Sequence, residues 1–119
     1  MEIGGSVQLD VGATGTTDIF TTPNNRGSFH VYDTCIRIVS KSGTQTGNPT
    51  LGIGTNSPNY DNMYNNNVTI PEGGAVDNFY IMDTAALIVV PASTDIKAKV
   101  TTAGGGSFVV NLFLVGFYN

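Results

Sequence analysis

Apolar residues recur along this chain at a period of two, in short runs separated by Gly, Pro, Asn and Ser, which predicts β-strands joined by turns. The longest run is residues 108–118, FVVNLFLVGFY, and it is rich in the β-branched and aromatic residues that strands favour. Residues 96–102 before it alternate apolar and polar side chains. Three glycines at 104–106 separate the two runs, so we predict that they form a hairpin.

The last run is apolar on both of the faces that a strand would present. One face holds Val110, Leu112, Leu114 and Tyr118, and the other holds Val109, Phe113, Val115 and Phe117. Two explanations fit this pattern. The strand is central in a sandwich or closed barrel, with a loop over its outer face, or its outer face is buried by another subunit. The pattern leaves both explanations open.

We count eight candidate strands and no convincing helix, with turn signals between the strands. The strands are residues 17–22, 29–40, 50–54, 68–70, 79–82, 86–90, 96–102 and 108–118. Within 29–40 the apolar positions change from odd to even, which predicts a β-bulge near Asp33 and Thr34. Eight short strands favour an all-β, single-domain β-sandwich, and the jelly roll is the commonest eight-stranded form.

The first sixteen residues are rich in Gly, Thr and Ser and contain only a brief apolar alternation. We therefore predict a flexible N-terminal arm over residues 1–16 and a β-sandwich domain over residues 17–119. The arm is expected to be disordered, or to be ordered on a neighbour. Its apolar residues, which are the candidates for contact with such a neighbour, are Ile3, Val7, Leu9 and Val11.

Composition narrows the classes of partner. Charged residues make up 12% of the 119 residues, against roughly 25% in an ordinary soluble domain, and the net charge is −4. The five basic residues are scattered, which argues against nucleic acid as a partner. Cys35 is the single cysteine, so an intrachain disulfide and a cysteine-based zinc site are excluded. Without a signal peptide or a run of about twenty apolar residues, we expect a soluble chain with no membrane partner.

No pattern typical of catalysis is found. His30 is the sole histidine, so a Ser-His-Asp, Cys-His or multi-histidine metal site would have to be built around a residue that begins a strand among apolar neighbours. The nine acidic residues are dispersed, and the glycines at 104–106 are not followed by the Lys-Ser or Lys-Thr of a phosphate loop. We therefore expect no enzyme activity, no cofactor and no metal site.

Residues 55–67 form the most biased segment of the chain, and asparagine dominates it. Aromatic rings that stack on sugars, together with amides that donate and accept hydrogen bonds, are the usual residue mix of a carbohydrate site. The candidate glycan-binding residues in this loop are Asn59, Tyr60, Asp61, Asn62 and Tyr64. A polar, solvated loop is the simpler interpretation of the same composition, and we favour it.

Two stretches within residues 17–119 are distinctive: GNPTLGIGT at 47–55, and a closing stretch from VTTAGG at 100–105 to LVGFY at 114–118. With these, the chain resembles small β-rich bacteriophage virion proteins, which include capsid decoration or cement proteins and modules of tails and fibres. The resemblance implies a structural role. For a decoration protein it implies a trimer over a symmetry axis of the capsid, with an N-terminal arm that reaches capsid subunits or neighbouring copies.

Decoration is the form that we expect, because the chain opens with its own Met and holds one small domain without shaft repeats or a coiled coil. We therefore expect a viral structural protein on the capsid surface, made in the host cytoplasm, with the major capsid protein and its own copies, as a homotrimer, for partners. The candidate subunit interface is Phe113, Phe117 and Tyr118. The alternative is a carbohydrate-binding or receptor-binding module of a tail or fibre, with a glycan as its ligand.

Overall fold

A computed structural model describes residues 2–119, and for residues 65–67 and 82–87 the description covers the backbone alone. The described residues form eight strands joined by turns and loops. In chain order the strands are β1 (Glu2–Asp10), β2 (Gly15–Thr21), β3 (Phe29–Ser42), β4 (Thr50–Gly54), β5 (Tyr64–Thr69), β6 (Phe79–Val90), β7 (Asp95–Thr102) and β8 (Ser107–Tyr118). The prediction of an all-β domain is confirmed.

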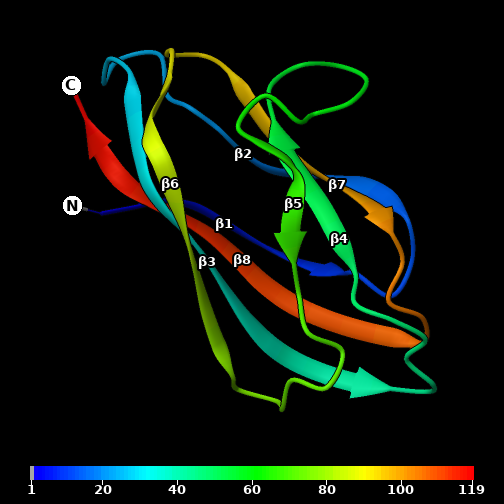
Figure 1. The fold of residues 1–119 in the computed structure, drawn as a ribbon. Helices are drawn as coiled ribbons and strands as arrows, with labels where there is room; N and C mark the ends of the chain where they lie inside the picture. Colours follow the sequence, from blue (N-terminus) through cyan, green and yellow to red (C-terminus); the bar gives the residue numbers. More distant parts are fainter. Residues whose placement is uncertain (1) are drawn as a thin grey trace.

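The strands form two antiparallel four-stranded sheets that pack face to face (Figure 1). Sheet A has the order β1-β8-β3-β6, and sheet B has the order β2-β7-β4-β5. The first strand pairs with the last, the second with the seventh, the third with the sixth and the fourth with the fifth. These pairings are those of one long hairpin rolled into two layers. The arrangement is a single compact β-sandwich, and it is compatible with the predicted jelly roll.

The predicted hairpin of the last two strands is wrong, because β7 belongs to sheet B and β8 to sheet A. The glycines between them form a crossing, and Gly105 and Gly106 adopt positive φ angles of 83° and 61°. The crossing is fixed against the β1–β2 connection, where Gly104 N–H donates to the carbonyl of Val11 at 2.9 Å and Gly105 N–H to that of Gly12 at 3.0 Å. Turn residues indicate where a chain reverses, but they do not indicate which sheet it enters next.

The predicted N-terminal arm is also wrong. Residues 2–10 are strand β1, which pairs along its length with β8 at one side of sheet A. The glycines in this strand serve packing: a Cβ atom on Gly4 would lie 2.3 Å from the ring of Phe29, and one on Gly5 would lie 2.2 Å from the ring of Phe20. Glycine is therefore present here because two aromatic rings pack directly on the backbone.

The predicted strands at 79–82 and 86–90 are one continuous strand, β6. The predicted bulge is confirmed, since the register of β3 shifts between Val31 and Asp33 against both of its neighbours, β6 and β8. One bulge thus changes the apolar parity of β3 and keeps its inner face in the core on either side of the shift.

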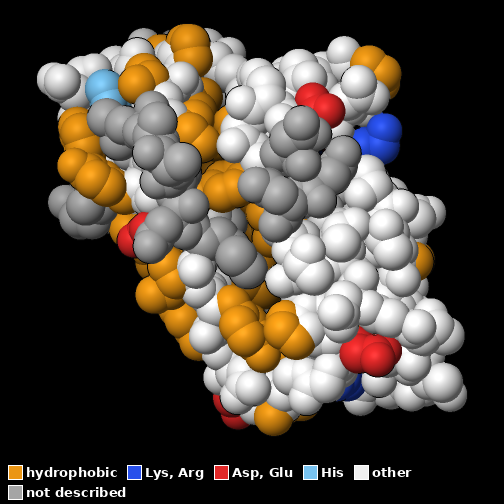
Figure 2. All heavy atoms as spheres, in the orientation of Figure 1, with side chains coloured by type: hydrophobic (Ala, Val, Ile, Leu, Met, Phe, Trp, Pro, Cys, Tyr) orange, Lys and Arg blue, Asp and Glu red, His pale blue; other side chains and the backbone are white. Residues whose placement is uncertain are grey.

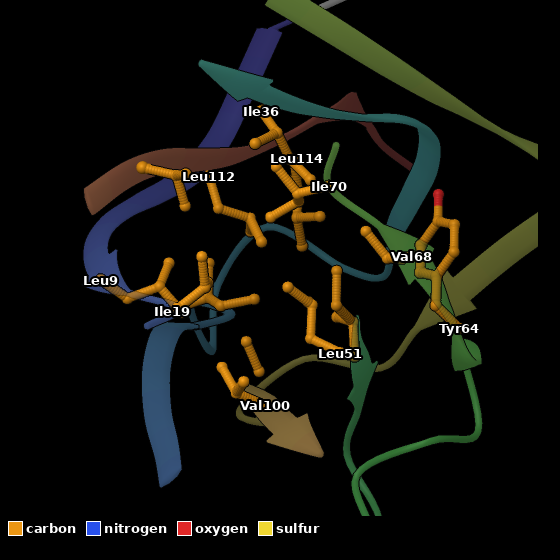
Figure 3. Packing of buried hydrophobic residues seen from close by; sticks show 14 of the residues in the cluster. Leu9, Ile19, Ile36, Leu51, Tyr64, Val68, Ile70, Val100, Leu112 and Leu114 are labelled. Atoms are coloured by element: carbon orange, nitrogen blue, oxygen red, sulfur yellow. The ribbon is translucent and has the colours of Figure 1, made fainter. Parts of the chain in front are cut away.

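The core lies between the two sheets, and one face of β8 contributes Phe108, Val110, Leu112 and Leu114 to it, all fully buried. Figure 3 shows Leu112 and Leu114 pointing toward Leu51 and Val100, which come from sheet B. Complete burial of an aliphatic or aromatic side chain contributes about 1.5–3 kcal/mol to the free energy of unfolding. This one strand is therefore a large part of what holds the two sheets together.

Candidate functional site

The other face of β8 points away from the core, at the outer surface of sheet A. Its apolar side chains, Val109, Phe113, Val115 and Phe117, are each half-buried. They are partly covered by their neighbours in the same sheet, because β1 lies on one side of β8 and β3 on the other. The register places Phe113 opposite Cys35 of β3, and Cys35 in turn opposite Ile81 of β6.

Large apolar side chains on the three other strands of sheet A are more exposed. They are Ile3 (60% exposed), Tyr32 (45%), Phe79 (49%), Ile81 (57%) and Val89 (50%). Figure 2 shows hydrophobic side chains gathered along the side of the molecule where β6 and β3 lie. We call the five together with Phe113, Val115 and Phe117 the apolar outer face. Its members on β1, β3 and β6 are exposed and those on β8 are half-buried, so no loop among the described residues buries this face completely.

Ring contacts fix the aromatic members of this face. The ring of Phe117 stacks on His30 with centroids 4.7 Å apart and an interplanar angle of 6°, and Tyr32 packs against Phe117 at 5.5 Å. The centroid of Phe113 lies 5.7 Å from that of Phe79. Such pairs lower the freedom of the exposed rings, so the face presents a surface of defined shape.

His30 of β3 lies beside this face, against Phe117. Its Nδ1 atom is buried without a hydrogen-bond partner among the described residues, and its ring lies flat on Phe117. Within residues 2–119, apart from the side chains of 65–67 and 82–87, no three His, Cys, Asp or Glu side chains lie close enough together to hold a metal ion. The same described residues contain no helix long and apolar enough to cross a membrane.

The structure separates the three residues proposed as a subunit interface. Phe113 and Phe117 belong to the apolar outer face, whereas Tyr118 packs inward, with its ring centroid 4.9 Å from that of Phe29. The guanidinium of Arg26 lies 4.0 Å above the Tyr118 ring, and burial raises the pKa of the Tyr118 hydroxyl. Tyr118 therefore closes one end of the core and does not share a surface with the two phenylalanines.

The four apolar residues of the predicted arm are also separated. Leu9 and Val11 are buried in the core, Val7 is half-buried against it, and Ile3 alone is exposed, where it pairs with Val115 of β8. The start of β1 is tied down by Glu2, whose carboxylate accepts two hydrogen bonds from Arg26 at 2.8 and 3.0 Å. These hydrogen bonds hold the pKa of Glu2 below its ordinary value.

At the other end of β1, Asp10 fixes the passage from sheet A to sheet B. Its carboxylate accepts hydrogen bonds from the backbone N–H groups of Phe108 at 2.9 Å and Gly12 at 2.8 Å. These bonds, with that of Phe108 the largest cause, lower the pKa of Asp10. The carboxylate is therefore bound to the first residue of the buried run in β8 and to the start of the β1–β2 turn.

The asparagine-rich loop uses its polar groups on itself. Asn56 Oδ1 accepts from the N–H groups of Asp61 at 2.8 Å and Asn62 at 3.1 Å, and Asn56 Nδ2 donates to Asp61 Oδ1 at 2.7 Å. Asn62 Oδ1 accepts from the N–H of Thr55 at 2.9 Å. The side-chain amides of Asn56 and Asn62 and one carboxylate oxygen of Asp61 are thus engaged within the loop.

The two candidate tyrosines of this loop do not act together. Tyr64 is a buried core residue (Figure 3), whereas Tyr60 is half-buried beside Lys97, whose Nζ lies 5.6 Å from its ring centroid. Asn59 is exposed on the same loop. The side chains of residues 65–67, at the end of the segment, lie outside the described part of the chain. A pair of tyrosines facing one sugar is therefore not formed.

Four exposed members of the apolar outer face were missed from the sequence: Tyr32, Phe79, Ile81 and Val89. A signal for them was present, because residues 79–82 and 88–90 are apolar at both parities, as in the last strand. No protein-family model matches this chain, and searches found neither a curated protein nor a solved structure with significant similarity to it. The properties of its surface are therefore the basis for assigning a role.

Proposed function

We propose that this chain is a structural, non-enzymatic protein of a bacteriophage virion, which binds the outside of the capsid and stabilises it. The observation that carries the proposal is the apolar outer face of sheet A. A monomer rarely exposes a contiguous apolar surface of more than a few hundred Å², and a larger one indicates a surface that another protein covers. A chain with such a face is suited to a permanent assembly.

The resemblance to small phage virion proteins gives further support. Its closing stretch, residues 100–118, contains the end of β7 and nearly all of β8, so it includes Phe113, Val115 and Phe117. Its other stretch, residues 47–55, contains β4 in the middle of sheet B. The similar segments are thus strands that build the sandwich and its apolar face, which fits a structural role better than a catalytic one.

The way in which we expect the chain to meet the major capsid protein changes with the structure. A free N-terminal arm is not the means, because residues 2–10 are a strand of sheet A. Of the four arm residues, Ile3 alone remains at an exposed surface. We therefore propose that folded surfaces of the sandwich, and not an extended tail, make the contact with the capsid.

The alternative, a carbohydrate-binding or receptor-binding module of a tail or fibre, has less support. It requires the asparagine-rich loop to present rings and free amides, but Tyr64 is buried, and Asn56 and Asn62 are hydrogen-bonded within the loop. Tyr60 and Asn59 are the residues left for such a role.

The test is co-sedimentation of the purified chain with capsids assembled from the major capsid protein of the phage that is found to carry it. We expect saturable binding and a higher temperature of capsid disruption when the chain is bound. A Tyr60→Ala variant is the matched control for the alternative, and it should bind capsids as the wild type does. Capsids that take up no chain at any concentration would refute the proposal, and binding to a glycan array that is lost in Tyr60→Ala would favour the alternative.

A further inference from the structure

We propose that the apolar outer face of sheet A is covered by the same face of a second copy of this chain. The proposal rests on the structural role proposed above, and it names the first partner of the exposed sheet. The assembling unit would then be a two-fold dimer, formed by sheet-on-sheet packing of the kind that already joins sheets A and B within one chain.

The described part of the chain leaves these side chains of the face exposed. Five large side chains of this face are 45–60% exposed, although β8 and β3 are paired with a neighbouring strand on both sides. Every segment within residues 2–119 already belongs to one of the two sheets or to a connection between strands. No segment among them is free to fold over the outside of sheet A.

The exposed area is close to what a stable self-association needs. A fully exposed aromatic side chain offers about 200 Å² and an aliphatic one less, so half exposure of the five leaves at most about 500 Å². The half-buried Phe113, Val115 and Phe117 between them add to that area. A stable interface of standard size buries about 800 Å² on each partner, and this sheet can supply most of that from apolar side chains.

The chemistry of the face favours a copy of the same chain over an unrelated partner. Interfaces between identical subunits are more apolar than interfaces that form and dissociate, whose composition resembles the remaining surface. Two charged residues of β3 lie on this side of sheet A: Arg37, which is paired with Asp77 at 2.7 Å, and Asp33, which lies opposite Val115 of β8. Aromatic and aliphatic groups need no complementary charge, so two identical faces can pack although each chain carries a net charge of −4.

The first experiment measures the mass of the purified chain in solution by light scattering at low micromolar concentration. We expect a mass of twice 12.5 kDa, and a mass of three times 12.5 kDa would contradict the packing of two identical faces on each other. Ile81→Lys and Val89→Lys each place a charge on an exposed position of the face and should weaken association on the order of ten-fold or more. Thr69→Lys is the matched control, because Thr69 is an exposed strand residue of sheet B, and this variant should keep the mass of the wild type.

A second measurement needs no variant and therefore does not depend on the folding of a mutant. Dilution should dissociate the wild-type oligomer and lower its mass. The fluorescence per chain of a dye that binds exposed apolar surface should then rise, because the faces separate. A monomer at all concentrations up to about 100 μM would overturn the proposal, since its dissociation constant would then be too weak for assembly. It would also be overturned by Ile81→Lys and Val89→Lys variants that keep the wild-type mass, or by dissociation without a rise in dye binding.

The outcomes separate this inference from the proposed function. An oligomer that does not sediment with capsids would refute the capsid role and leave the self-association intact. A monomer that sediments with capsids would refute the self-association and leave the capsid role intact.

Discussion

Strands β7 and β8 occupy equivalent positions, each second in the order of its own four-stranded sheet, yet their outer faces differ. In β7 the residues that alternate with the buried ones are Lys97 and Lys99. Lys97 Nζ lies 3.0 Å from Asp18 Oδ1, and Lys99 Nζ donates to the carbonyl of Pro58 at 3.0 Å. In β8 the corresponding residues include Phe113, Val115 and Phe117. Since position in the fold is the same, it does not explain the difference.

The sandwich itself requires only one apolar face from each sheet. Sheet B meets that requirement and shows polar side chains to water, as antiparallel sheets commonly do. The second apolar face of sheet A adds nothing to the packing between the sheets. The proposed self-association would account for it, and the difference between the two sheets can be measured.

The largest effect is expected from removing the strand that lies beside β8. Deletion of residues 2–10 exposes the edge of β8 and removes Leu9 from the core, so the thermal midpoint should fall by at least about 10 °C, or the chain should fail to fold. Circular dichroism during heating measures this. An unchanged midpoint would show that the N-terminal segment is dispensable for the fold, as a free arm would be.

A smaller difference is expected between neighbouring residues on the two faces of β8. Leu112→Ala removes a fully buried side chain and should lower the free energy of unfolding by about 2–5 kcal/mol. Phe113→Ala removes a half-buried ring and should cost about 1–2 kcal/mol. Urea denaturation at low protein concentration measures the free energy of unfolding of both variants. Light scattering also gives the solution mass of the Phe113→Ala variant. Equal losses in the isolated chain would mean that the outer face is as important to the fold as the core.

The smallest effect is expected at Asp10, the last residue of β1, where the chain leaves sheet A for sheet B. Because the folded pKa of Asp10 is lowered, its contribution to stability is present above the pKa of the unfolded chain and is lost as the pH falls through the folded value. Asp10→Asn should therefore be less stable than the wild type at pH 7, by no more than about 1 kcal/mol since the group is largely exposed. Below about pH 4 the gap should narrow. A gap that is independent of pH would contradict the role of the charge.

Much of the strand pattern was readable from the sequence, because alternation at a period of two is a local property. The bounds of β4 and the bulge near Asp33 followed from it, as did the two apolar faces of the last strand. Strand β1 was missed because its Gly4 and Gly5 look like a flexible segment until Phe29 and Phe20 are seen to pack on them. The glycines at 104–106 look like a hairpin turn for a similar reason, since nothing local shows that they cross between sheets.

Three features could be predicted from the sequence alone: the all-β class, the single sandwich, and a strand whose two faces are both apolar. The tertiary structure decided which of those faces is the core, that Tyr118 lies with the core and not with Phe113 and Phe117, and that Ile81 and Val89 extend the outer face. The physical reason is that alternation fixes the two sides of a strand locally. Which side meets the other sheet, and which strands lie alongside, depends on pairings between residues far apart in the chain.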